Sequence, residues 1–317
     1  MKENKCIMTI KIYSIMSISA ITNHYLPDKN NGYYCMGNKT ACQHFAEDGA
    51  KIIPWSKDPE FDDDVVSLRL ELTDKNVKSL KGRPPQWLAG LAKLTFLQMP
   101  LELMVNMEPG DLPVGLKSLM LVHYETSSYS APLAWRALAE STALEALTLQ
   151  NDFGSESCAA FTCVSDFQML NLSFLSYDSA KNGKLVTLID NNKSFELISI
   201  DCITHDEINS DAVRNATGLS FIGVDKTIDL HSLEGLSNLE AIFINSAKCE
   251  IDCSIFDKIP NIKEVEIINS KQITNPAALL SNRKVNKLFV LDCGNPFKKL
   301  KKEVIPGDYE LLDIDYS

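Results

Sequence analysis

The sequence predicts an α/β solenoid in which short parallel strands alternate with short helices or turns along one axis. Three apolar residues recur in the spacing L-x-x-I-x-I, as in Leu239, Ile242 and Ile244. The last residues of eleven such triplets are Leu70, Met99, Leu121, Leu149, Tyr177, Ile200, Val224, Ile244, Ile267, Val290 and Ile314. Neighbouring triplets lie 20 to 29 residues apart. Recurrence at this period is the signature of a repeat architecture.

Each triplet predicts one short strand, because alternate residues of a strand point to the same face. A single coil cannot bury its own apolar face, so neighbouring coils stack and share one core that grows along the axis. The pattern is strongest from Ile228 to Asn269. It is weakest in the copies ending at Tyr177 and Val224, where the connecting segments are irregular and residues 167–172 offer a competing frame.

The chain divides into two predicted parts. Residues 1–60 lack the triplet spacing, and we expect them to form a small cap that covers the first coil. Residues 61–317 form the repeat domain of about eleven repeats. Proline precedes Trp87 and Trp135 in two early repeats, which predicts short helices packed on these tryptophans. The segment Ser232–Leu236 predicts a shorter helix or a 3₁₀ turn.

Residues 61–317 resemble the leucine-rich repeat family. The closest segments are Leu91–Leu97 and Leu236–Ile242. The asparagine that the family places three residues after the triplet is replaced in four copies by Tyr124, Asp152, Ala247 and Ser270. The resemblance implies a horseshoe with a parallel sheet on its concave face, short helices or 3₁₀ turns on its convex side, and protein binding by the concave face.

Charge and hydropathy indicate the kind of partner and location. The net charge of −11 and the pI near 5.0 argue against nucleic acid or an anionic membrane as ligand and favour a cationic partner. No apolar run reaches the length of a membrane helix. We therefore expect a cytoplasmic protein that is monomeric when free. The alternative is export, if residues 1–20, with Lys2, Lys5 and Lys11, act as a signal peptide.

The spacing of the nine cysteines and of the acidic residues indicates no metal site, and we expect no cofactor. There is no C-x-x-C pair. Three pairs close in sequence are either disulfides or reduced thiols, and we expect reduced thiols: Cys35 with Cys42, Cys158 with Cys163, and Cys249 with Cys253. Cys293 occupies the turn position at which the repeat pattern places Asn or Cys. The run Asp62–Asp64 is interpreted as a solvated acidic turn.

Catalytic motifs are missing from the sequence. The five histidines have no H-E-x-x-H spacing, and there is no phosphate-binding loop or G-x-S-x-G motif. His205, Asp206 and Glu207 are adjacent, but a convex turn with a helix cap is the favoured interpretation over an acid/base cluster. We predict that the protein is not an enzyme.

The predicted strands define a candidate partner-binding surface, because residues flanking the last two triplet members point away from the core. These positions carry carboxylates, an amide and four phenylalanines. The candidate residues are Phe174, Asp178, Asp201, Phe221, Asp225, Phe243, Asn245, Glu264, Glu266 and Phe289. Large apolar anchors among like charges are typical of a protein interface. The alternative is that the phenylalanines are covered or belong to a misplaced repeat.

The predicted function is the capture of a basic protein on the concave face. A lone acidic repeat module looks like bacterial toxin-neutralising proteins, so one specific hypothesis is an immunity protein that blocks a cationic toxin domain. An alternative is a secreted or host-directed effector or adhesion protein, indicated by signal cleavage and disulfides. A third is an enzyme that uses His205 and the neighbouring acids.

Overall fold

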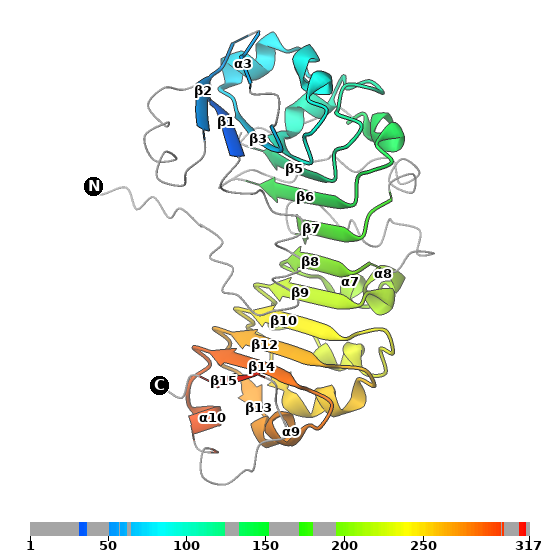
Figure 1. Cartoon of the computed structure of the whole chain (residues 1–317). Coiled ribbons are helices and arrows are strands. Elements are labelled where there is room, and N and C mark those ends of the chain that lie inside the picture. Colours follow the sequence, from blue (N-terminus) through cyan, green and yellow to red (C-terminus); the bar gives the residue numbers. More distant parts are fainter. Residues whose placement is uncertain are drawn as a thin grey trace, which may run out of the picture.

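The sheet of this protein is long and continuous. The computed structural model describes residues 32–36, 51–56, 58–61, 65–123, 133–151, 171–179, 195–298, 300 and 311–314. Within these residues, thirteen strands form one sheet in the order β15-β14-β12-β10-β9-β8-β7-β6-β5-β4-β3-β1-β2. Every neighbouring pair is parallel. Figure 1 shows the strands following one another along an elongated, curved molecule.

Eleven of these strands match the eleven predicted repeats. They are β3 (Ser67–Glu71), β4 (Phe96–Pro100), β5 (Ser118–His123), β6 (Ala146–Asn151), β7 (Phe174–Asp178), β8 (Leu197–Asp201), β9 (Gly218–Ile222), β10 (Ala241–Asn245), β12 (Glu264–Ile268), β14 (Lys287–Leu291) and β15 (Leu311–Ile314). The described triplet residues Leu70, Met99, Ile200 and Ile244 are all buried in one core cluster. This arrangement is the leucine-rich repeat solenoid that the sequence predicts.

Ten of the eleven predicted registers are confirmed, and the one ending at Val224 is wrong. Phe221, not Val224, pairs with Ile200 and with Ile244 on the neighbouring strands. The sequence is ambiguous here because Leu219, Ile222 and Val224 imitate the triplet spacing. The true frame puts Gly223 directly after the strand with φ +64°. Glycine adopts that left-handed conformation at no steric cost, whereas the rejected frame would place it within the strand.

A left-handed residue follows the strand in five consecutive repeats. These residues are Cys202, Gly223, Ser246, Asn269 and Asp292. The backbone N–H of each of the first four donates to a carbonyl of the next repeat at 2.8 to 3.0 Å, namely to Ile222, Asn245, Ile268 and Leu291. We call this series the turn ladder. It links neighbouring repeats through main-chain atoms.

The position after the turn ladder is the one at which the family places asparagine. Ile203, Val224 and Ala247 fill it with buried apolar side chains. Ser270 and Cys293 keep a bonding role, because Ser270 Oγ donates to the Ile268 carbonyl at 2.9 Å and Cys293 Sγ lies 3.3 Å from the Leu291 carbonyl. The predicted role of Cys293 is confirmed. The side-chain ladder of the family is only partly present.

Within the described residues, short helices lie in the connections between strands on the convex side. They are α3 (Asp74–Ser79), α7 (His205–Ile208), α8 (Asp211–Asn215), α9 (Pro276–Ser281) and α10 (Asn295–Lys298), with 3₁₀ segments η3 (Gln86–Gly90), η4 (Leu101–Met104), η5 (Trp135–Glu140), η6 (Leu230–Leu233) and η7 (Cys253–Lys258). A small parallel pair, β11 (Ile251–Asp252) with β13 (Ile273–Thr274), lies between them. Trp135 is buried, and Trp87 packs against Trp55 and Phe61, as packing tryptophans should.

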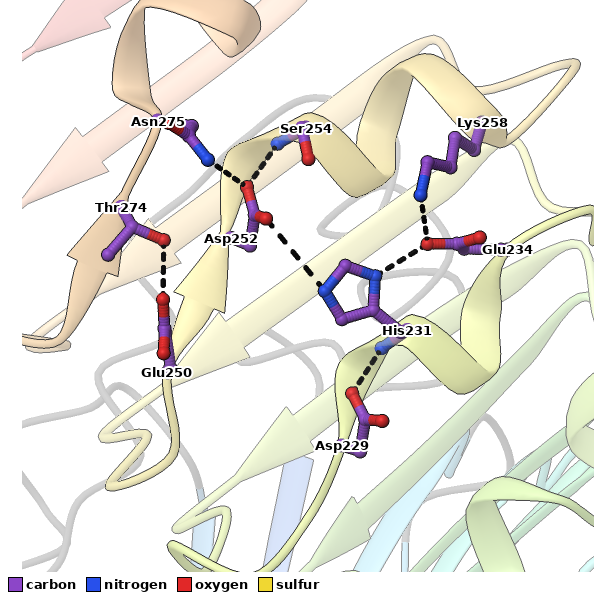
Figure 2. A network of polar contacts seen from close by, with 9 residues as sticks. All are labelled: Asp229, His231, Glu234, Glu250, Asp252, Ser254, Lys258, Thr274 and Asn275. Carbon is purple, nitrogen blue, oxygen red and sulfur yellow. Dashed lines mark hydrogen bonds and ion pairs between the residues drawn. The ribbon is translucent and has the colours of Figure 1, made fainter.

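Polar contacts join three late repeats on this convex side, as Figure 2 shows. His231 Nδ1 lies 2.5 Å from Glu234 Oε1, and Lys258 Nζ lies 2.6 Å from the same oxygen. Asn275 Nδ2 donates to Asp252 Oδ1 at 2.9 Å, and this bond contributes most to the lowered pKa of Asp252. These pairs are exposed to water, which screens them, so each adds little to stability.

The N-terminal part adds two strands to the sheet. β1 (Gly32–Met36) pairs with β3 in the register of the repeats, so that Tyr33 stands level with Leu68. β2 (Lys51–Pro54) lies beyond β1 and is the last strand on that side. β1 therefore extends the repeat register into residues 1–60. The division into a cap of residues 1–60 and a repeat domain of residues 61–317 stays a prediction.

Several sequence predictions fall on other segments. Residues 1–20 and the acidic run 62–64 lie outside the described residues, as do Cys42, Cys158 and Cys163. In the described part of the chain, Cys249 and Cys253 are both free and buried. No helix among the described residues is long and apolar enough to span a membrane.

Candidate partner-binding surface

The concave face is the sheet face opposite the core, and each strand contributes its first, third and fifth residues to it. On β8 these are Leu197, Ser199 and Asp201, whereas Ile198 and Ile200 are buried in the core. Parallel pairing without a register shift places equivalent residues side by side in three rows. A side chain on this face is therefore flanked by known neighbours one strand away, about 4.8 Å on either side.

Two aspartates meet in the third row. Asp178 on β7 pairs with Asp201 on β8, and both are half-buried, so their predicted placement is confirmed. Burial and then the neighbouring charge of Asp178 raise the pKa of Asp201 to about 6. Asn245 occupies the same row two strands further on and accepts a hydrogen bond from Ser246 Oγ at 2.9 Å. This part of the face is rich in acceptors.

Two glutamates lie on β12, in the first and middle rows of the concave face. Glu264 and Glu266 are on the predicted face but are each only 2% exposed. The Oε1 atom of Glu266 is buried without a hydrogen-bond donor within the described part of the chain. Burial and then the charge of Glu264 raise the pKa of Glu266 to about 8. A carboxyl group in these surroundings is largely protonated at neutral pH.

Three of the four predicted phenylalanines lie on the concave face. Phe243 and Phe289 are half-buried there and stand one strand to either side of Glu266. The predicted exposure of Phe174 is wrong, because it is only 5% exposed and belongs to a small apolar cluster with Ala146, Leu197 and Ala241. Phe243 packs against the same cluster. Concave side chains cover one another here, which strand periodicity alone does not reveal.

The register error at β9 removes two candidate residues from this surface. Phe221 is 0% exposed and lies in the core, so its predicted concave position is wrong. Asp225 lies in the loop after β9, and its carboxylate accepts hydrogen bonds from Thr227, which lower its pKa. Ile222 takes the place that Asp225 was predicted to hold in the third row. The row of acids is therefore interrupted at β9.

A hollow at the amino ends of strands β8 to β14 was missed by the sequence reasoning. Gly218 and Ala241, two small first-row residues, lie between the larger Leu197 and Glu264. Its other lining residues are Glu196, Thr217, Glu240, Lys263, Asn286 and Lys287. The sequence could have indicated this hollow only with the correct register of β9, because only that register puts a glycine, Gly218, in the first row.

Gly218 is required by a close backbone approach. A Cβ atom at this position would lie 2.7 Å from the carbonyl oxygen of Glu196. Beside the hollow, Lys263 Nζ and Glu240 Oε2 form an exposed ion pair of 2.8 Å. The hollow thus has two small residues, Gly218 and Ala241, among mostly polar and charged ones.

The residues considered for catalysis are separated in the structure. The expected helix cap is present, because Thr204 and Glu207 form a capping box at the start of α7, while His205 is exposed. Glu207 is buried and accepts hydrogen bonds from Tyr177 Oη at 2.5 Å and Ser179 Oγ at 2.6 Å. Its carboxylate is thus used to join β7 to α7. In the described segments there is no group of three metal-binding side chains.

Comparisons with known proteins add the following. No protein-family model matches the chain, and no curated protein matches it. A solved structure with a similar arrangement is that of an internalin from Listeria monocytogenes, at 15% sequence identity and a TM-score of 0.42. The match covers 78% of this chain and 69% of the internalin chain. The strand register of the chain itself carries the assignment of the fold.

Proposed function

We propose that this chain is a non-enzymatic binding module that captures a basic protein on its concave face between β7 and β14. One observation carries the proposal: Asp178, Asp201, Glu264 and Glu266 lie on one sheet face as two adjacent pairs. Burial, and then the like charge of the neighbouring acid, raise the pKa values of Asp201 and Glu266. A cationic partner would favour the ionised forms of these acids, so their pKa values should fall when a basic ligand binds.

Half-buried apolar side chains next to these acids support the same proposal. Phe243 and Phe289 occupy the middle row, and Ile222 and Leu291 the third row. Aromatic anchors supply most of the affinity of a typical interface, while charges at its rim steer the partner and select against the wrong one. We expect the free chain to be monomeric.

The experiment is a charge reversal on the concave face with a matched control. The immobilised chain captures its partner from a lysate of the source cells, and the affinity is then measured with the purified partner. Asp178→Lys with Asp201→Lys should weaken binding at least about tenfold, because each reversal sets a cation against the partner. The control, Glu140→Lys with Asp257→Lys, makes the same change in net charge at exposed convex positions.

The two double variants separate a local effect from a general electrostatic one. Equal weakening by both would show that only net charge matters, and unchanged binding by the concave variant would remove this surface from consideration. Raising the salt concentration should slow association with the wild-type chain, since steering acts through exposed charges.

A more specific version of the proposal is an immunity protein that neutralises a cationic toxin domain in the cytoplasm. It rests on the acidic face and on the resemblance described above. A toxin gene beside the gene for this chain, with protection of cells by co-expression, would support it. Cleavage of residues 1–20 in the mature protein would instead favour the alternative of an exported effector or adhesion protein.

A further inference from the structure

Glu266 is a buried carboxyl group with one oxygen that has no hydrogen-bond partner among the described residues. It is 2% exposed, and its Oε1 atom has no donor in the described part of the chain. A carboxylate in such surroundings is normally paired or hydrogen-bonded, because leaving a buried charge unpaired is costly. An unsatisfied acceptor of this kind on a binding face indicates a ligand that brings donors.

The neighbours of Glu266 are known from the strand register. On β10 the concave positions are Ala241, Phe243 and Asn245, and on β14 they are Lys287, Phe289 and Leu291. Lys287 stands level with Glu264 and not with Glu266. Glu264 is the other titratable concave group of β12. Level with Glu266 on the two neighbouring strands there are phenylalanines and no cation.

The spacing of these strands suits a flat cation. Strands lie about 4.8 Å apart, so the Cα atoms of Phe243 and Phe289 are about 10 Å from each other across β12. A cation held over Glu266 then lies roughly within the 6 Å at which an aromatic ring face attracts it, on both sides. A carboxyl group flanked by two aromatic residues offers a hydrogen-bond acceptor with an aromatic side chain on the strand to either side.

We propose that Glu266, flanked by Phe243 and Phe289, is a subsite for one arginine side chain of the basic partner. The inference rests on the proposed function and specifies the chemistry of the captured residue. Arginine fits better than lysine because its planar guanidinium stacks on rings, is weakly hydrated and donates in a fork that matches a carboxylate.

Titration of Glu266 gives the subsite a pH dependence. Burial and then Glu264 raise the pKa of Glu266 to about 8, so at neutral pH most molecules must lose a proton before the carboxylate can pair with a cation. The guanidinium does not titrate in this range. Affinity should therefore rise by about 25-fold between pH 6.5 and pH 8.5, because the ionised fraction of Glu266 rises by that factor.

The test uses a small probe that needs no protein partner. The chain, with its 13 phenylalanines replaced by 4-fluorophenylalanine, is titrated with acetyl-arginine amide at pH 8.5 and followed by ¹⁹F NMR. Phe243→Leu and Phe289→Leu identify the two relevant signals. We expect both signals to shift and saturate. Acetyl-citrulline amide, a neutral analogue of the same shape, should bind at least about tenfold more weakly, since charge-assisted pairing is lost.

Two variants complete the test. Glu266→Gln should weaken the arginine probe at least about tenfold and abolish its pH dependence, while Glu140→Gln on the convex side should change neither. Equal binding of citrulline, unchanged binding by Glu266→Gln, or shifts confined to other phenylalanines would overturn the subsite. Absence of a saturable response would do the same. If the chain still captures a basic protein although the arginine probe does not bind, the proposed function holds and only this subsite is wrong.

Discussion

Replacing Phe221 by Ala tests the register of the repeats directly. Phe221 is 0% exposed and stands in the core between Ile200 and Ile244. Truncating a fully buried phenylalanine typically costs 3–5 kcal/mol, because transfer free energy is lost and a cavity remains. A site stacked between two flanking coils has little freedom to collapse, so we expect a loss of about 4 kcal/mol.

The matched control is Phe243→Ala, the same chemical change on the concave face. Phe243 is half-buried and packs against only a small cluster, so we expect a loss of about 1 kcal/mol. The assay is urea denaturation followed by circular dichroism. For a chain of this size the Phe221 variant should unfold at a urea concentration lower by about 1 M, and the Phe243 variant by a few tenths.

The relative size of the stability losses in Phe221→Ala and Phe243→Ala distinguishes the two possible registers of β9. If Val224 ended the triplet, Phe221 would lie on the concave face, and its removal would then cost no more than that of Phe243. A loss below about 1 kcal/mol for Phe221→Ala would refute the core position argued from the strand pairing.

Two further changes follow from the concave face. Gly218→Ala should destabilise the fold by about 1–3 kcal/mol, because the added Cβ meets the Glu196 carbonyl oxygen at 2.7 Å. The control Gly90→Ala has open space around its Cβ and should be nearly neutral. Thermal unfolding compares the two variants, and equal effects would contradict the close approach at Gly218. Glu266→Gln should stabilise the chain at pH 8.5 but not at pH 4.5. In the folded chain the pKa of Glu266 is about 8, above its value in the unfolded chain, so the stability of the wild type falls as pH rises between these two pKa values, by up to about 5 kcal/mol. A stability difference between variant and wild type that does not change with pH would refute this linkage.

The sequence was sufficient for the architecture because the core is periodic. Ten triplets identify the inward residues of their strands, since each coil repeats the same burial requirement at nearly the same interval. The frame at β9 failed because Leu219, Ile222 and Val224 satisfy the spacing as well as Ala216, Leu219 and Phe221 do. A triplet of apolar residues carries no information on the backbone conformation that follows it.

The binding face was less predictable than the core. Strand alternation correctly placed Asp178, Asp201 and Phe243 on the concave face, because alternation depends only on the frame. Exposure depends also on the size of the residues one strand away. Phe174 is covered because concave side chains of other strands pack on it, and no pattern within its own repeat reports those neighbours.

Because the turn ladder is formed by main-chain atoms, the spacing of the repeats does not depend on which side chains its residues carry. Cys202, Ser246 and Asn269 share a backbone shape although their side chains differ in chemistry. Substitutions that tolerate this backbone shape should therefore leave the spacing of neighbouring repeats unchanged. The side chains along that edge are therefore free to differ in chemistry without changing the stacking of the coils.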